Sequence, residues 1–505
     1  MTKSRNAAPA AGAQVAVLLA VAMLTGGAQA APPIGDVEFV RGAGAAQRPG
    51  QAARVLGSGS PVEEGEVLTT GANGFAVVKL NDGTRMTLRP NTSMKIDEFI
   101  LEQPGKSDNL VMNLLKGGLR LVTGSIGKRV STSRLVTSTA TVGIRGTDFD
   151  ARICADDCKA EARRPVSPVA QASANALVTA SARVVQMQGG LTATGATGER
   201  RLVTPGGPVY RGDTLETAAG AQAILVFRDD TRVTVQSGTR IRIQDYVYDQ
   251  KNPAQGSFAL GLLKGGIRAL TGLIAKSSPG NVHFATTTAT VGIRGTGLDL
   301  RCEGSGAGEP GTAGPADGCF IATWQGEVTI ASVAAPAEVV VVPAGSAASV
   351  TPGQAPAQLL TETPAFMRDN SAPRPDGISP NIEQLFGVVR QEEPDSGLYV
   401  TLRDGQLAIE RDGRTLDIGR GESAFVDTSG RTLVRLDAAP TFILSDPTPR
   451  PDRIDARGVQ LLNTQSLGLR TRADLVCTPC PAPAIRVPPI DRRFGIYTSS
   501  VAICA

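Results

Sequence analysis

A nine-residue phrase occurs twice in this chain. Residues 139–147 and residues 288–296 both read Thr-Ala-Thr-Val-Gly-Ile-Arg-Gly-Thr. Unrelated stretches do not match at nine consecutive positions by chance, so the phrase marks an internal duplication. Its first half suits a pleated strand, because Thr and Val favour sheets. Its paired glycines predict a bulge, a bend or a close backbone approach. These glycines are Gly143, Gly146, Gly292 and Gly295.

The duplication extends on both sides of the phrase. Residues 64–70 align with 211–217, and residues 114–120 align with 262–268. The offset between the copies drifts only from 147 to 149 residues. Each copy is therefore a module of roughly domain size and not a short solenoid repeat.

Five phrases follow one another in the same order in both copies. In the first copy they are Gly35-Asp36-Val37, the step Glu64-Gly65-Glu66-Val67-Leu68-Thr69-Thr70, the strand Asn81-Asp82-Gly83-Thr84, the strand Leu115-Lys116-Gly117-Gly118-Leu119-Arg120 and the closing Gly143-Ile144-Arg145-Gly146-Thr147. This ordered set resembles the FecR domain over about residues 35–152 and 182–350. The resemblance implies that each module is a twisted, β-solenoid-like stack of strands.

The residues by themselves predict an all-β chain. Asn81-Asp82-Gly83 is a hairpin turn signal, and glycines punctuate the strands that come after it. No segment shows a helical period with a capping box. A smaller β segment near the C-terminus repeats the strand order of residues 320–350.

The expected organisation has seven parts. They are a signal peptide (1–30), a first FecR-like β module (31–158), a linker (159–181), a second module (182–350), a Pro-rich linker (351–397), a partial β repeat (398–444) and an irregular C-terminal region (445–505).

The first 30 residues are typical of a secretory signal peptide. Lys3 and Arg5 precede an apolar run over 13–24, and a small-residue site predicts cleavage between Ala30 and Ala31. The run is shorter than the roughly 20 residues that span a bilayer. No other stretch approaches a membrane span, so we expect a periplasmic or secreted protein that is not integral to the membrane. The alternative is an uncleaved anchor.

Seven cysteines suit an oxidising compartment. Two pairs follow the duplicated phrase, and we expect Cys154 to bond Cys158 and Cys302 to bond Cys319. Near the C-terminus, Cys477 is expected to bond either Cys480 or Cys504, and sequence cannot decide between them. A redox role for Cys477 and Cys480 is the alternative, although no βαβ pattern surrounds them. The spacing of a four-ligand zinc site is missing.

Charge and motifs argue against several classes of function. The formal charge of +4 falls to +2 without Lys3 and Arg5, and no basic stripe indicates a nucleic-acid partner. The single histidine, His283, aligns with Arg134, which suggests a tolerated strand position. The glycines do not form a nucleotide-binding loop. The Arg-Gly-Asp at 211–213 aligns with Glu-Gly-Glu and is read as a turn. We expect no metal and no small-molecule cofactor, although a pair of carboxylates stays open as general acid and base.

Arg145 and Arg294 occupy the same slot between glycines in the two copies. We expect each to be buried and to hold the fold, because a guanidinium can satisfy several acceptors at once. Asp82 and Asp229 also match between the copies and are the expected carboxylate partners. The alternative is that the arginines recognise an anion or a partner.

Two functions from different classes remain. The first is a non-enzymatic extracytoplasmic binding, scaffold or signal-sensing protein with an unidentified envelope protein partner. The resemblance supports it, because FecR domains lie in the periplasmic part of membrane-bound sigma-factor regulators. This chain departs from those regulators, since a cleavable signal replaces the cytoplasmic segment and the membrane span. The alternative is an envelope enzyme that acts on cell-wall or surface glycans. Aromatic side chains, on which sugar sites depend, are few: 13 Phe, 5 Tyr and 1 Trp.

Overall fold

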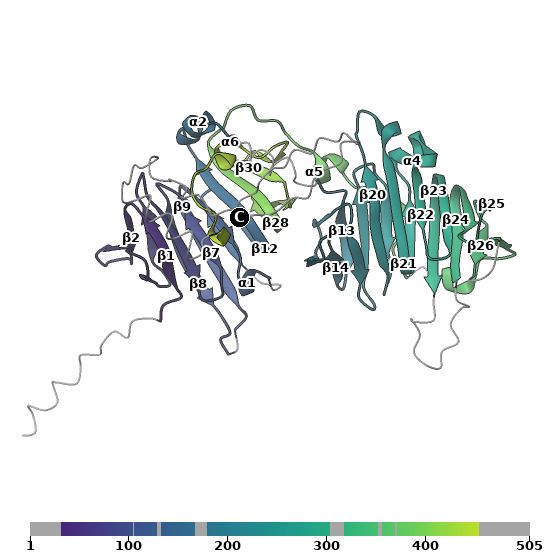
Figure 1. The fold of residues 1–505 in the computed structure, drawn as a ribbon, viewed down its shortest axis with the longest axis horizontal. Coiled ribbons are helices and arrows are strands. Elements are labelled where there is room, and N and C mark those ends of the chain that lie inside the picture. Colours follow the sequence, from purple (N-terminus) through teal and green to yellow (C-terminus); the bar gives the residue numbers. More distant parts are fainter. Residues whose placement is uncertain are drawn as a thin grey trace, which may run out of the picture. The chain divides into compact units, whose positions relative to one another are not determined.

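The computed structural model describes residues 32–104, 106–128, 133–166, 179–303, 318–351, 356–368 and 371–453. Strands dominate these ranges, and their longest helix, α2 (Asp157–Ala162), has six residues. The prediction of an all-β chain is therefore confirmed (Figure 1). The expected signal peptide with Ala30 and Ala31 lies outside the described residues, as do Cys477, Cys480 and Cys504.

The first copy of the repeat forms one curled sheet. Its strands follow the order β3-β2-β5-β8-β9-β11-β12-β10-β7-β6-β1-β4. The elements are β1 (Gly35–Arg41), β2 (Gly44–Gln47), β3 (Arg54–Val55), β4 (Pro61–Val62), β5 (Val67–Thr70), β6 (Phe75–Leu80), β7 (Arg85–Leu88), β8 (Ser93–Ile100), β9 (Asn109–Lys116), β10 (Gly118–Val122), α1 (Ser125–Lys128), β11 (Arg134–Thr137) and β12 (Thr141–Cys154).

The second copy repeats this arrangement as a second sheet. Its elements are β13 (Ala182–Gln188), β14 (Leu191–Thr194), β15 (Arg200–Val203), β16 (Pro208–Val209), β17 (Thr214–Thr217), β18 (Gln222–Phe227), β19 (Arg232–Val235), β20 (Arg240–Val247), η1 (Pro253–Gln255), β21 (Ser257–Leu270), α4 (Leu273–Ser277), η2 (Pro279–Asn281), β22 (Val282–Ala285), β23 (Ala289–Glu303), β24 (Gly318–Ser332), β25 (Ala335–Pro343), β26 (Ala347–Val350) and β27 (Gln358–Leu360). The pairings repeat in detail, including the parallel pairs β9 with β11 and β21 with β22.

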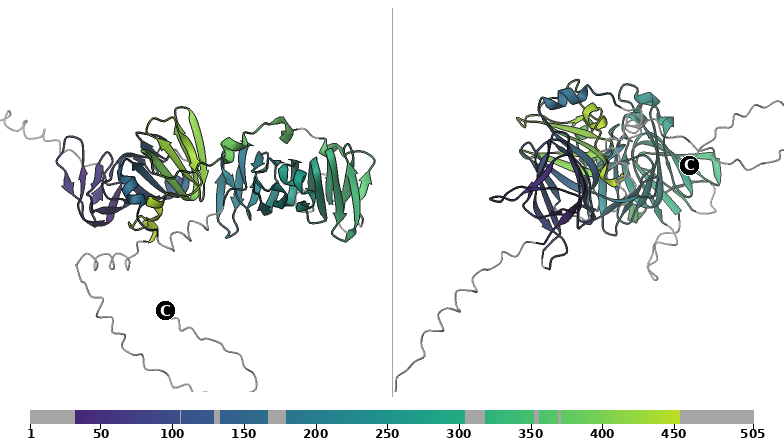
Figure 2. Two further views of the ribbon diagram at one scale, coloured as in Figure 1. Left: turned by 90° about the horizontal axis from the view of Figure 1, so that it is seen from above. Right: turned by 60° about the vertical axis from the view of Figure 1, so that its left-hand side comes forward.

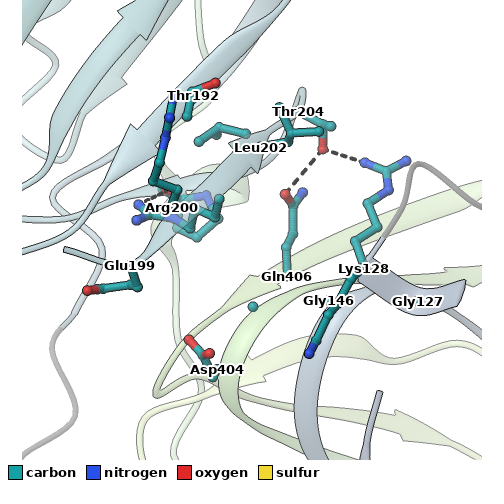
Figure 3. Close-up of a pocket in the computed structure, with 15 residues that line it drawn as sticks. Gly127, Lys128, Gly146, Thr192, Glu199, Arg200, Leu202, Thr204, Asp404 and Gln406 are labelled. Carbon is teal, nitrogen blue, oxygen red and sulfur yellow. Dashed lines mark hydrogen bonds between the residues drawn. The ribbon is translucent and has the colours of Figure 1, made fainter. Parts of the chain in front are cut away.

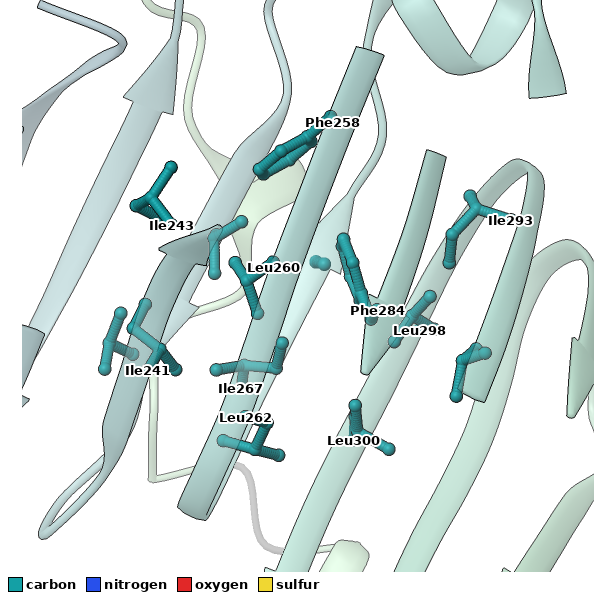
Figure 4. Close-up of a cluster of buried hydrophobic side chains, with 14 of the residues drawn as sticks. Ile241, Ile243, Phe258, Leu260, Leu262, Ile267, Phe284, Ile293, Leu298 and Leu300 are labelled. Atoms are coloured by element: carbon teal, nitrogen blue, oxygen red, sulfur yellow. The ribbon is translucent and has the colours of Figure 1, made fainter. Parts of the chain in front are cut away.

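Long strands that change partners fold each sheet over its own core. The first half of β21 pairs with β20, and its second half pairs with β19. The change falls at Gly265, whose positive φ of 84° suits glycine. Side chains from β20 to β23 meet between the resulting layers, where Phe258, Phe284 and Leu300 are buried (Figure 4). Burial of this apolar surface, at about 25 cal/mol per Å², drives formation of the module.

The C-terminal β segment completes the sheet of the first copy. It contains β28 (Gly397–Arg411), β29 (Arg414–Gly419), β30 (Ser423–Asp427) and β31 (Leu433–Leu436). Strand β28 pairs antiparallel with β12 from Thr141 opposite Glu410 to Cys154 opposite Gly397. Strand β24 pairs with β23 in the same way. Figures 1 and 2 show the yellow-green strands of this segment beside the blue strands of the first copy.

The first sheet is thus built from two distant parts of the chain. Residues 397–436 extend the sheet next to β12 in the same way that residues 318–360 extend it next to β23. The first module accordingly comprises 32–166 together with 397–453, and the second module comprises 179–380. The second module is inserted between β12 and β28 of the first.

Segments outside the sheets also carry structure. The expected linker at 159–181 begins inside α2, and the expected Pro-rich linker at 351–397 contains several short elements. These are β27, η3 (Ala365–Met367), η4 (Pro375–Gly377) and α5 (Ile382–Phe386). Met367 and Ala372 are buried, so this segment packs on the sheet and is no free spacer. Residues 441–453 form α6 (Thr441–Leu444) and η5 (Pro451–Arg453).

The four described cysteines form two different staples. Cys302 and Cys319 lie opposite one another on β23 and β24, with their Cα atoms 4.1 Å apart. Cys154 and Cys158 join the end of β12 to α2, with a Cα separation of 5.5 Å. The Cys302–Cys319 bond links two neighbouring strands, whereas the Cys154–Cys158 bond fixes a helix to the end of a strand. The two staples therefore hold different elements, although both come after the duplicated phrase.

Candidate functional site

The duplicated phrase forms the corner of each sheet. A register shift interrupts the β12–β28 ladder just after Arg145, and the same shift interrupts β23–β24 just after Arg294. Gly146 and Gly295 have φ values of 59° and 66°, which glycine adopts without strain. The expected bulge is therefore present in both copies.

The partner strand also bends at this corner. A Cβ on Gly405 of β28 would lie 2.0 Å from the carbonyl oxygen of Gly146. A Cβ on Gly326 of β24 would lie 2.8 Å from the carbonyl oxygen of Gly295. Both contacts are closer than real Cβ atoms allow, so each corner depends on glycine in two strands.

The expected burial of Arg145 and Arg294 is wrong. Both side chains are exposed, and that of Arg294 is 64% exposed. The physical reason is the two-residue period of a strand: Ile144 and Ile293 point into the core, so the arginine next to each points outward. Among the described residues, Arg294 pairs with the half-exposed Glu327, at 3.3 Å.

Asp82 and Asp229 are not the partners of these arginines either. The Asp82 carboxylate accepts hydrogen bonds from the Thr84 amide at 2.9 Å and from its hydroxyl at 2.8 Å. It also accepts from the backbone N–H of Ile126, at the start of α1. Its role is therefore to fix a turn against the next helical turn.

Asp229 repeats these contacts with Thr231 and Ile274 in the second module. It also accepts a hydrogen bond from the hydroxyl of Tyr246 at 3.2 Å. Burial raises the pKa of Asp229, although its hydrogen bonds oppose that shift. Burial beside this carboxylate raises the pKa of Tyr246 as well.

Two other duplicated arginines, Arg120 and Arg268, do hold the fold. Both are buried, and each faces an aspartate across the ladder. Arg120 Nε lies 2.9 Å from Asp150, and Arg268 Nε lies 3.4 Å from Asp299. The signal was in the sequence, because these arginines close the matching Leu-Lys-Gly-Gly phrases and the aspartates come after the nine-residue phrase at equal distances.

Each buried arginine also holds a segment that lies over its sheet. Arg120 donates to the carbonyl oxygens of Thr448 at 2.6 Å and Asp446 at 3.3 Å. Arg268 donates to the carbonyl oxygen of Ala372 at 2.7 Å. We call residues 441–453 the strap of the first module, and the described residues between 365 and 377 (365–368 and 371–377) the strap of the second.

The strap of the first module ends in a network of buried charges. Asp446 lies 2.6 Å from Arg89 and 3.4 Å from Arg120. Arg450 of the same strap pairs with Asp148 at the bulge. Burial raises the pKa of Asp148 to about 6, and the nearby Arg450 opposes that shift.

A hollow of about 530 Å³ lies beside the first corner (Figure 3). Arg145 reaches across it and donates to Thr204, whose hydroxyl donates to Gln406 at 3.2 Å. The wall carries charges of both signs and one exposed leucine. These are Lys128, Arg200, Glu199, Asp404 and Leu202. Such a wall can bind a polar or charged group by ion pairs and hydrogen bonds.

Other predicted positions carry no chemistry that we can assign. His283 is exposed on β22, and the Asp213 of the Arg-Gly-Asp turn is buried against Arg201. Within the described residues, no three His, Cys, Asp or Glu side chains gather as a metal ion requires. Within the same residues, no helix is long and apolar enough to cross a membrane.

Comparison with known proteins adds the family. The model of the FecR protein family matches residues 66–163 and 213–309. No curated protein matches the chain. Two crystal structures of a protein assigned as an anti-sigma factor from Parabacteroides distasonis match with 13% identity and a TM-score of 0.22, covering 30% of this chain. This chain matches 59% of the length of that protein. The two matched regions show that the chain contains two tandem FecR domains.

Proposed function

We propose that this protein is a non-enzymatic, extracytoplasmic regulatory protein that binds an envelope protein. The observation that carries the proposal is the placement of the duplicated polar side chains. Asp82, Asp229, Arg120 and Arg268 are all engaged with their own modules. The buried duplicated side chains therefore hold each module together, whereas the exposed duplicated arginines, Arg145 and Arg294, are left for recognition.

The environment of Trp324 does not support the alternative function, an enzyme that acts on glycans. Sugar sites use a free aromatic face, against which the apolar side of a sugar ring can pack. The ring of Trp324 is covered by Arg374, whose guanidinium carbon lies 4.3 Å from the ring centroid. The regulatory function is therefore the better supported of the two.

The position we assign to partner recognition is Arg145, which projects into the mixed-charge hollow. The matched control is Arg294, which occupies the equivalent corner and pairs with Glu327 on an open surface. Exchange of Arg145 for glutamate reverses a charge without touching the core. The same exchange at Arg294 makes the equivalent change away from the hollow.

The test places a photo-cross-linking residue at Lys128, on the wall of the hollow, in otherwise unchanged protein expressed in its own cells. We expect a specific envelope protein to be cross-linked, to be lost with Arg145→Glu and to be kept with Arg294→Glu. Fractionation should recover the chain outside the cytoplasm with Ala31 as its first residue. A cytoplasmic location, or hydrolysis of envelope glycans by the purified protein, would overturn the proposal.

A further inference from the structure

One internal contact joins the start of the second module to the end of the first. Arg183 on β13 is fully buried and donates to Glu422 at 2.7 Å, to the Leu385 carbonyl at 2.8 Å and to the Gly206 carbonyl at 2.9 Å. Its pairing with a carboxylate is needed, because an unpaired buried charge is costly.

The surfaces around this ion pair fit closely. A Cβ on Gly419 of β29 would lie 2.4 Å from Pro208 and 2.5 Å from the Tyr210 hydroxyl. The guanidinium of Arg420 lies 4.9 Å from the centre of the Tyr210 ring. We call the surface that β13 and β16 contribute to this contact the head face of the second module. The surface that β28 and β29 contribute is the tail face of the first module.

Because the modules are duplicated, each has both faces. The head face of the first module is formed by β1, β3 and β4, where Pro61 stands opposite Asp36 as Pro208 stands opposite Arg183. The tail face of the second module is formed by β24 and β25. There Val341 lies opposite Thr329, which is the position that Asp417 takes opposite Ala408 in the first module.

No other described segment covers these two outer faces, and each carries exposed apolar side chains. Val55 on the outer head face is 83% exposed. Val339 and Val341 on the outer tail face are 55% and 45% exposed. Pro61 and Pro343 are exposed as well, whereas their counterparts in the internal contact, Pro208 and Gly419, are buried.

The charges on both outer faces differ from those on the corresponding faces of the internal contact. Asp36 stands where the internal head face has Arg183. Val341 and Ser346 stand where the internal tail face has the acids Asp417 and Glu422. An outer tail face that kept those acids would repel Asp36, because like charges at an interface cost several kcal/mol.

We propose that the outer tail face of one chain binds the outer head face of a second copy, in the manner of the internal contact. Valine and proline side chains on both faces would then leave water, which favours association. Two different surfaces meet in this contact, so copies join head to tail into a ring or an open chain. This assembly is separate from the envelope partner proposed above.

The test uses the mature full chain with one carboxylate placed on each outer face. Pro61→Asp disables the head face, because its counterpart Pro208 is buried against Gly419 in the internal contact. Val341→Asp restores on the tail face the acid found at Asp417. Both positions are exposed, so circular dichroism should be unchanged. Leu359→Asp on β27 is the matched control, since Leu359 is 56% exposed and lies on neither face.

Sedimentation velocity over a range of concentrations gives the readout. We expect wild type and Leu359→Asp to form species larger than one chain, whereas Pro61→Asp and Val341→Asp each sediment as single chains. An equimolar mixture of the two should form a two-chain species and nothing larger, because each variant keeps the face that the other has lost.

Three results would overturn the proposal. The first is wild-type protein that remains a single chain at every concentration. The second is loss of assembly in Val341→Asp but not in Pro61→Asp, with no recovery on mixing, which would indicate symmetric pairing of two β25 edges. The third is loss of assembly in Leu359→Asp as well.

Discussion

The buried arginines of this protein show how one residue can hold two elements. Arg120 pairs with Asp150 on the neighbouring strand, and its remaining donors reach the backbone of the strap. A lysine could not do both, because its ammonium lacks the planar fork of a guanidinium. Arg145, which sits in the more prominent motif, makes none of these contacts.

Replacement of Arg120 with alanine should lower the free energy of unfolding by about 3–5 kcal/mol, because Asp150 is left buried and less compensated. Arg120→Lys should recover little of this loss. Arg145→Ala should change stability by no more than about 0.5 kcal/mol, as expected for an exposed side chain. Urea unfolding of the three variants measures the difference. An equal loss in Arg145→Ala would contradict the assignment.

Asp148 should make stability depend on pH. Its pKa is raised from 3.8 to about 6 by burial, so the folded protein binds this proton more tightly than the unfolded chain does. The stabilising contribution is fully present below pH 3.8 and is lost as the pH rises through about 6. Asp148→Asn should remove this dependence. Unfolding curves of both proteins between these pH values test it, and parallel profiles would show that the pKa of Asp148 is not raised.

At the scale of elements, the sequence predicts the strands and their bulges better than it predicts the segments that pack over the sheets. The duplicated glycines indicated the corners, and both bulges are present. The straps could not be predicted, because segments such as 365–377 have the Pro-rich composition of a linker and are held by arginine donors to backbone carbonyls. A backbone acceptor leaves no signature in the sequence.

The exposure of Arg145 and Arg294 could have been predicted. The alternation of Val142, Gly143, Ile144 and Arg145 already places the arginine on the outer face of a strand. The mixed-charge hollow could not, because Thr204 and Gln406 are 202 residues apart and nothing in their local sequence links them.

The two disulfides should differ in their contribution to stability. Removal of the Cys302–Cys319 bond, with a sequence separation of 17, should cost about 3 kcal/mol in the chain-entropy model. Removal of the Cys154–Cys158 bond, with a separation of 4, should cost about 2 kcal/mol. Paired Cys→Ser variants, compared by denaturant unfolding under non-reducing conditions, measure both. A larger loss for the shorter loop would show that the anchoring of α2 outweighs loop entropy.

At the scale of the whole molecule, the first module depends on residues from both ends of the described chain. Strand β12 lies between β10 and β11 on one side and β28 on the other. Without β28, a long row of backbone groups on β12 would be unpaired, and Leu398, Val400 and Leu402 would be missing from the core.

A fragment of residues 31–166 should therefore not fold cooperatively, whereas a fragment of residues 179–380 should. Joining 31–166 to 388–453 through a short flexible linker should restore a cooperative transition, because the ladder to β28 is regained. Thermal melting followed by circular dichroism distinguishes the three proteins. A cooperative transition in the 31–166 fragment alone would show that β28 is an accessory to a self-sufficient sheet.

The insertion of one module into the other sets an order in time. Synthesis delivers residues 32–166 first, yet their sheet cannot close until β28 emerges more than two hundred residues later. The inserted module has all its strands beforehand and can fold while the first still waits. During that interval the open edge of β12 resembles the exposed strands on which misfolded chains associate. The half of the molecule that is made earliest is therefore the last to complete its sheet.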